Sequence, residues 1–249
     1  MQAFSLPDLL LIFTAFFLAG AVKGVLGLGL PTVAIGLLGL LMPVAQASSL
    51  LTVPSLVTNV WQARRGPHLG TLLRRLWPMQ LGIVIGALSG TGWMEPQHAR
   101  LSSLLLGGCL VVYGVASLAG LHLPRPAEQH ERATGLLAGI GTGLVTAATG
   151  VFALPLLPYL QALALDKDEM SQALGISFTV STAALGIVLA GTGSLDAPVA
   201  GQSLLALLPA IAGMAVGQAQ RDRLSQAAFR KAFFSGLVGL GLWLVLRHA

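Results

Sequence analysis

The chain has 249 residues, of which 55% are hydrophobic and only 9% are charged. An ordinary soluble domain carries about 25% charged residues, so the composition excludes a soluble globular enzyme, and the high hydrophobicity excludes a disordered chain. The net charge of +5 does not indicate nucleic-acid binding, because the basic residues are clustered between apolar segments, where they usually mark cytoplasmic loops.

Long stretches of the sequence contain no Asp, Glu, Lys or Arg. One membrane span needs about 20 mostly apolar residues, so these stretches predict an all-α, polytopic helical membrane protein. Their unbroken apolar runs argue against the alternating strands of a membrane β-barrel. The six longest charge-free stretches are 24–63, 76–94, 101–124, 133–165, 170–195 and 197–220.

The first apolar segment, 8–41, is too short for two full spans. Its 34 residues would form roughly 51 Å of helix, whereas two spans need about 60 Å and a turn. We therefore predict two short or broken helices here. The expected break lies at Gly24, Gly27, Gly29 and Pro31.

Another apolar segment follows at 46–63, and then single crossings are predicted at 72–92 and 99–121. The loop expected at 64–75 contains Arg64, Arg65, Arg74 and Arg75. Such a basic loop is typical of the cytoplasmic side. Further loops are expected at 93–99 and 122–132.

The second half of the chain resembles the first. The sequence LAGAVKG at 18–24 recurs as LAGIGTG at 137–143, which places Thr142 opposite Lys23, and each copy leads to a proline, Pro31 or Pro155. A second pair of broken helices is predicted in 133–164, interrupted at Gly141, Gly143, Gly150 and Pro155. Later segments are expected at 170–191, 198–218 and 226–246, with loops at 166–169, 192–197 and 219–226.

This repetition predicts two transmembrane repeats, 1–125 and 126–249, with about five segments each and eight to ten transmembrane helices in total. An odd number of segments inverts the second repeat and places the strongly basic loops on one side. The broken pairs could cross the membrane or re-enter it. Paired, Gly/Pro-interrupted segments are a pointer to a transporter binding site, so we expect a multi-pass membrane transporter.

Lys23 is the first candidate for substrate binding, because a cation inside an apolar segment is costly and is usually functional. If the helix breaks beside it, free N–H groups at Gly24, Gly27 and Gly29 and a helix N-terminus would add partial positive charge. Together these groups would suit a small anion. Alternatively, Lys23 ends a short helix and extends to the cytoplasmic interface.

Uncharged polar residues supply further candidates. Asn59 and Gln62 are three residues apart and share one helical face. Hydroxyl groups of the second half could complete an anion site from the other side. Both sets could instead bond within or between helices. The hydroxyl candidates are Thr142, Thr146, Thr149, Ser177, Thr179, Ser181 and Thr182.

No Asp or Glu lies in the middle of a predicted span, there is no Walker A motif, and the histidines form no helical metal-binding pair. We therefore expect no enzyme activity, no catalytic residues, no metal and no cofactor.

Taken together, the motifs resemble those of the TauE/SafE family of sulfite exporter-like permeases. In the first half they are VKGVLGLGLP at 22–31 followed by Pro54, Asn59, Trp61 and Gln62. In the second half they are Thr149-Gly150, Leu154-Pro155 and YLQALALDKDE at 159–169. The resemblance covers essentially the whole chain and implies a bacterial inner-membrane permease for sulfite, organosulfonates or related anions.

The predicted function is a secondary transporter or facilitator of small sulfur-containing anions, bound between the two broken helix pairs. The alternatives are a permease for another small solute or a metal ion, and a non-transporting membrane assembly factor. The expected partners are the anion and the lipid bilayer, with a homodimer as a further option. The predicted substrate-binding residues are Lys23, Gly24, Gly27, Gly29, Pro31, Asn59, Gln62, Thr146, Thr149, Gly150, Pro155, Thr179 and Thr182.

Overall fold

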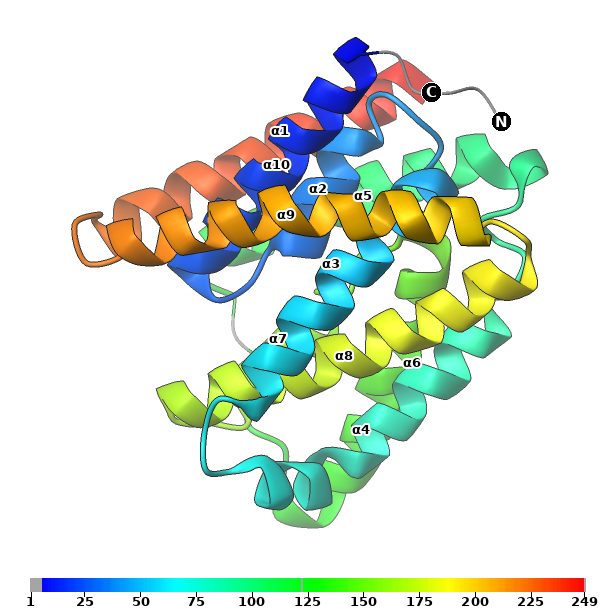
Figure 1. Cartoon of the computed structure of the whole chain (residues 1–249). Coiled ribbons are helices and arrows are strands. Elements are labelled where there is room, and N and C mark those ends of the chain that lie inside the picture. Colours follow the sequence, from blue (N-terminus) through cyan, green and yellow to red (C-terminus); the bar gives the residue numbers. More distant parts are fainter. Residues whose placement is uncertain (1–5, 122, 249) are drawn as a thin grey trace.

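The fold is known from a computed structural model, which describes residues 6–121 and 123–248. This part of the chain is entirely helical, with ten α-helices and two short 3₁₀-helices and no strand (Figure 1). The α-helices are α1 (Leu6–Leu26), α2 (Leu30–Leu38), α3 (Val44–Arg64), α4 (Leu69–Ser89), α5 (Ala99–Leu118), α6 (Glu131–Thr149), α7 (Leu156–Ala162), α8 (Lys167–Gly191), α9 (Ala197–Gln220) and α10 (Gln226–His248).

The prediction of an all-α membrane protein is confirmed. Within the described part, five helices are long and apolar enough to cross a membrane. The other long helices, α3, α4 and α6, have 19 to 21 residues but lack a stretch as apolar as those of the five. The five candidate spans are Asp8–Leu26, Pro96–Leu118, Lys167–Gly191, Ala197–Gln220 and Gln226–His248.

Both predicted helix breaks are present. In the first, α1 ends at Leu26, Gly27 and Gly29 have positive φ angles of 75° and 101°, and α2 begins at Leu30. In the second, Gly150 follows α6 with φ 71°. Only glycine adopts such angles at little steric cost, which explains why the helices end there. Each break separates one long helix from one short helix, so of the two predicted forms, short or broken helices, the broken form is present.

Three glycines assigned to the breaks lie inside helices instead. Gly24 belongs to α1, and Gly141 and Gly143 belong to α6. A Cβ at Gly24 would overlap the carbonyl oxygen of Met214, and one at Gly143 would overlap that of Ile83. Gly24 and Gly143 therefore permit close contact between helices, the usual role of small residues in membrane bundles.

Two predicted loops are shorter than expected. The loop 64–75 is mostly helical, because α4 begins at Leu69. Only Asp166 of the predicted loop 166–169 lies outside α8, which begins at Lys167. Asp166 caps this helix through a reciprocal pair of hydrogen bonds with Glu169. Such a capping box satisfies the free N–H groups of the first turn. The remaining predicted segments and loops match helices and connections within a few residues, apart from residues 1–5, 122 and 249, which lie outside the described part.

The helices pack in pairs that join distant parts of the chain. α1 lies along α9, α4 along α6, and α5 along α10, while α3 contacts both α8 and α9 at the centre of the bundle (Figure 1). α3 carries many buried polar side chains, including Ser55, Thr58, Asn59 and Gln62. A polar centre therefore lies inside an apolar bundle.

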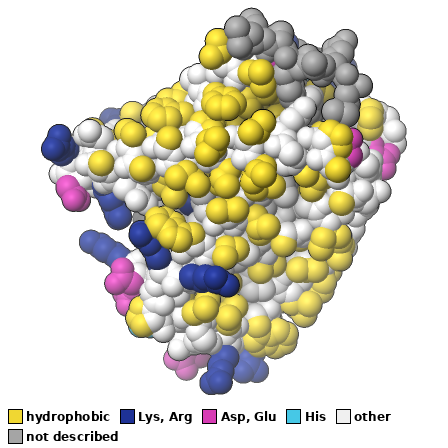
Figure 2. All heavy atoms as spheres, viewed as in Figure 1, with side chains coloured by type: hydrophobic (Ala, Val, Ile, Leu, Met, Phe, Trp, Pro, Cys, Tyr) yellow, Lys and Arg dark blue, Asp and Glu magenta, His cyan; other side chains and the backbone are white. Residues whose placement is uncertain are grey.

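Hydrogen bonds and one ion pair hold one end of the bundle together. Arg75 of α4 forms a bidentate ion pair with Glu131 of α6: Nε donates to Oε1 at 2.6 Å and Nη2 donates to Oε2 at 2.8 Å. Gln172 of α8 donates to the carbonyls of Ala63 and Gly66 in the α3–α4 connection. We call this the basic end, because it contains Arg64, Arg65, Arg74, Arg75, Arg221, Arg223, Arg230 and Lys231. Lys and Arg side chains gather along the left and lower margins of the face in Figure 2, and hydrophobic side chains cover much of the rest.

Candidate anion-binding site

Lys23 lies in the last turn of α1 and is only 4% exposed. Its Nζ atom donates to Thr58 Oγ1 at 3.2 Å and to Asn59 Oδ1, both on α3. No carboxylate of the described residues forms an ion pair with Lys23. The lysine is therefore held by neutral acceptors that leave its charge uncancelled.

A chain of hydrogen bonds continues from Asn59 into α8. Asn59 Nδ2 donates to Ser55 Oγ at 2.9 Å, and Ser55 Oγ lies 3.0 Å from Thr182 Oγ1. Thr182 donates its own proton to the carbonyl of Phe178, so Ser55 is the donor to Thr182. Every donor in the chain thus points away from Lys23, which orients Asn59 Oδ1 as an acceptor for the lysine.

A cavity of about 490 Å³ opens beside Lys23, a volume within the usual range of ligand sites. It draws residues from α1, α3, α8, α9 and the α9–α10 connection. Three of its lining residues are basic and one is acidic, so it favours anions by charge. The lining residues are Lys23, Gly24, Gly27, Trp61, Gln62, Arg65, Ser171, Met214, Gln218, Arg221 and Asp222.

The cavity reaches the surface at the basic end, where Arg65, Arg221 and Asp222 are exposed. The Arg65 guanidinium lies 3.6 Å from the centroid of the Trp61 ring, a cation–π contact that orders a long side chain. Lys23 is thus the buried inner cation of the cavity, and the arginines are its outer cations.

Gln62 connects three elements at the wall of the cavity. Its Nε2 atom donates to the carbonyl of Gly27 at 2.9 Å and to that of Ser171 at 3.0 Å. The first carbonyl belongs to the break after α1 and the second to α8. Gln62 therefore links the glycine break to the opposite wall.

The glycine N–H groups do not provide the expected anion site. Gly24 lies within α1, and Gly27 N donates to the carbonyl of Lys23 at 2.8 Å. Neither Gly29 nor Pro31, which stands in the first turn of α2, lines the cavity. Side chains, and not main-chain N–H groups, are therefore the donors that the cavity offers.

The predicted hydroxyls of the second half bond their own helices. Thr146, Thr149 and Thr179 each donate to the carbonyl four residues earlier, at 2.6 to 2.7 Å. None of them lines the cavity. Thr182 is joined to Lys23 only through Ser55 and Asn59.

The two helix breaks do not converge on one point. Gly27 contacts Gln62, whereas Gly150 lies against Ser48, fourteen positions earlier on α3. At 1.5 Å per residue these contacts are about 21 Å apart. Pro155 belongs to the second break and also lies outside the cavity. A small anion between the two breaks, as the sequence suggested, does not fit this arrangement.

The helix packing supports the correspondence between the two halves that the sequence indicated. Gly24 of α1 packs against α9 and Gly143 of α6 packs against α4, each facing a carbonyl oxygen and a glycine of the partner helix. This shared packing places Gly24 opposite Gly143 and therefore Lys23 opposite Thr142. The second break comes one helical turn later, because Gly150 follows Gly143 by seven residues whereas Gly27 follows Gly24 by three.

The sequence did not point to Arg65, Ser171, Gln218 or Arg221 as site residues. The two arginines carried a signal, since they flank the ends of α3 and α9, but basic residues in connections are ordinarily topology signals. Their meeting in one cavity depends on the packing of α3 with α9, which a local pattern does not contain.

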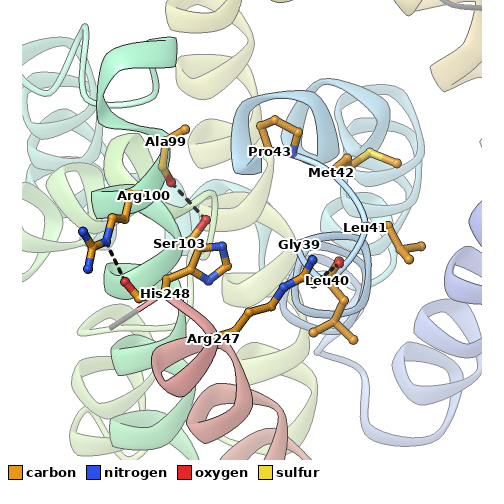
Figure 3. A pocket seen from close by; sticks show the side chains of 10 residues that line it. All are labelled: Gly39, Leu40, Leu41, Met42, Pro43, Ala99, Arg100, Ser103, Arg247 and His248. Atoms are coloured by element: carbon orange, nitrogen blue, oxygen red, sulfur yellow. Dashed lines mark hydrogen bonds between the residues drawn. The ribbon is translucent and has the colours of Figure 1, made fainter.

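A second cavity, of about 530 Å³, lies at the opposite end of the bundle (Figure 3). Its arginines bind backbone carbonyls: Arg100 Nε donates to His248 at 2.7 Å, and Arg247 Nη1 donates to Leu40 at 2.6 Å. These contacts tie α10 to α5 and to the segment after α2. The cavity at the basic end, with its buried lysine, is therefore the better candidate.

Replacing Asn59 with aspartate tests whether the charge of Lys23 is needed. The carboxylate keeps an acceptor for Lys23 Nζ but cancels its charge, so we expect anion binding to weaken about tenfold or more, as for loss of a charged hydrogen bond. Binding to the purified protein, measured by calorimetry, checks this. Ser103→Asp, in a helix outside the cavity, adds the same charge and should leave binding nearly unchanged; equal losses in both variants would contradict the role of Lys23.

Comparisons with known proteins cover nearly the whole chain. The family model described as "Sulfite exporter TauE/SafE" matches residues 12–244. A protein of Cupriavidus necator described as "Probable sulfite/organosulfonate exporter TauE" is 28% identical over 235 residues, which cover 94% of this chain and 87% of that protein. No solved structure matches the chain significantly.

Proposed function

Because the chain belongs to the TauE/SafE family of sulfite exporters, we propose that it moves small sulfur-containing oxyanions, such as sulfite or organosulfonates, through the cavity beside Lys23. Membership of this family makes the chain a membrane transporter and not an enzyme. The observation on which the proposal rests most heavily is the buried Lys23, held by neutral groups and facing a cavity with two further basic residues.

The proposed topology follows from the charges. The basic end faces the cytoplasm, because Lys and Arg are enriched in cytoplasmic connections, and the protein resides in the cell inner membrane. α3, α4 and α6 cross the membrane together with the five apolar helices, since α3 packs against α8 and α9, α4 packs against α8, and α6 packs along α4. The two halves, 1–125 and 126–249, form inverted repeats, and the pairing of α1 with α9 and of α6 with α4 supports that relation.

In the proposed mechanism an anion enters from the basic end, between Arg65 and Arg221. It then binds to Lys23 at the inner end of the cavity. Movement of one repeat against the other would open the site to the opposite side. Export needs no ATP in this scheme, because a membrane potential that is negative inside favours exit of an anion by about 2.3 kcal/mol per charge per 100 mV.

Flux in proteoliposomes tests the proposal. Purified full-length protein should accelerate the movement of sulfite, sulfoacetate or thiosulfate over that in protein-free liposomes. A potassium-diffusion potential of about 100 mV should drive the anion out of the negative compartment. If none of the three anions moves faster than in protein-free liposomes, the proposal is wrong. Movement of a metal ion or an uncharged solute instead would favour a permease of another class.

A further inference from the structure

Gln62, one of the residues that line the cavity, has a buried oxygen atom without a hydrogen-bond partner. The residue is 8% exposed, and its Oε1 atom has no partner among the described residues. Buried polar atoms are nearly always hydrogen-bonded in native proteins, so each exception calls for an explanation. A bound molecule with an O–H or N–H group would supply the missing donor.

The orientation of the Gln62 amide is fixed by its neighbours. Both atoms near the nitrogen position are carbonyl oxygens, of Gly27 and Ser171. A carbonyl oxygen only accepts hydrogen bonds, so the NH₂ group must occupy that position and Oε1 must be the free acceptor. Exchanging the two amide atoms would face oxygen against oxygen twice.

Lys23 offers the complementary group. A lysine has three N–H donors, and two of them contact Thr58 and Asn59. The third has no partner among the described residues and is available to an anionic oxygen. The buried part of the cavity thus combines one positive charge with one free acceptor.

Lys23 Nζ needs a hydrogen-bond acceptor on the ligand, whereas Gln62 Oε1 needs a donor. A fully deprotonated oxyanion has only acceptors, so it would satisfy Lys23 and leave Gln62 Oε1 unpaired. Hydrogensulfite, or a sulfonate with a hydroxyl group, has a single negative charge and a proton donor. A site that must hydrogen-bond a donor strongly rejects an analogue that lacks it.

We propose that Gln62 selects singly charged sulfur oxyanions with a proton donor, accepting that hydrogen bond at Oε1 while Lys23 binds the anionic oxygens. The selection rests on the proposed function, because it names the substrate class of the same cavity. It makes hydrogensulfite and hydroxyalkanesulfonates better substrates than sulfite dianion and plain alkanesulfonates.

Two ligands that differ by one hydroxyl group test this selection. Ethanesulfonate and 2-hydroxyethanesulfonate are both singly charged, and each is used to inhibit sulfite flux by the full-length protein in proteoliposomes. The hydroxyl compound should inhibit wild type about tenfold more tightly, the factor expected for one buried hydrogen bond. In Gln62→Met the two inhibitors should become equal, because the acceptor is lost.

Gln80 provides a matched control. It is also buried with an unpartnered Oε1, but its Nε2 donates to Ser177 at 2.9 Å and it does not line the cavity. Gln80→Met should therefore keep the tenfold preference of wild type. Because the preference is a ratio measured within one protein, altered expression of a variant does not change it.

The possible outcomes separate the two proposals. Equal inhibition of wild type by both sulfonates, with sulfite flux intact, overturns the role of Gln62 and leaves the proposed function standing; this result depends on no variant. Retention of the preference in Gln62→Met, or its loss in Gln80→Met, also overturns that role. Absence of sulfite flux in wild type removes the proposed function and the selection together.

Discussion

Replacing Lys23 with glutamine is expected to lower sulfite flux about a hundredfold, the scale seen when one partner of a buried charged contact is lost. The neutral side chain can still bond Thr58 or Asn59, so the fold should survive. The anion, however, would then enter a cavity without its buried cation. Flux per mole of reconstituted protein measures the effect.

Lys231→Gln is the matched control, because Lys231 is an exposed lysine in α10 that does not line the cavity. It changes net charge by the same amount and should leave flux within about twofold of wild type, since exposed charges are screened by salt. Wild-type flux in Lys23→Gln would show that the buried cation is not needed for transport, and would leave Lys23 only a structural contact with α3. Equal losses in both variants would indicate an effect of net charge.

Gly213→Ala is expected to destabilise the fold by about 1 to 3 kcal/mol, the usual cost of overpacking. A Cβ at this position of α9 would overlap the carbonyl oxygen of Phe17 in α1. Separating the two helices would also disturb the cavity, which takes Lys23 from α1 and Met214 from α9. Thermal unfolding in detergent, followed by tryptophan fluorescence, measures the loss.

Gly201→Ala controls for the change in helix propensity. Gly201 lies in the same helix, and a Cβ there would meet no atom within 4 Å. Alanine is the better helix former by about 1 kcal/mol, so this variant should match or exceed wild-type stability. If Gly213→Ala unfolds at the same temperature as Gly201→Ala, the close contact of α1 with α9 is not a source of stability.

The sequence predicted the helices well because the relevant forces are local. Charge-free stretches of span length identify α5, α8 and α9, and glycines that adopt positive φ identify the break at Gly27. The prediction failed for glycine, because a glycine can either end a helix or allow two helices to pack closely. Gly24 and Gly143 resemble break residues in sequence, but they pack against the backbone of another helix, and only the tertiary structure distinguishes the two roles.

For the site, the sequence identified Lys23, the buried cation, but not most of the residues that surround it. Lys23 stands out because a buried cation needs a reason, and Asn59 and Gln62 stand out as polar residues on one helical face. Ser55, which orients Asn59, and Arg221, which lines the same cavity as Lys23, do not stand out in this way. Their roles arise only when α3 packs against α8 and α9 and the Lys23 side chain of α1 reaches α3.

The most direct test of the account is to locate a bound anion by its own scattering. Selenite is the selenium analogue of sulfite, and crystals of the full-length protein grown with it would give an anomalous signal at the selenium edge. The account predicts a peak in the cavity at the basic end, within hydrogen-bonding distance of Lys23 Nζ. A peak only beside Arg100 and Arg247 at the opposite end, or a peak unchanged in Lys23→Gln crystals, would contradict it.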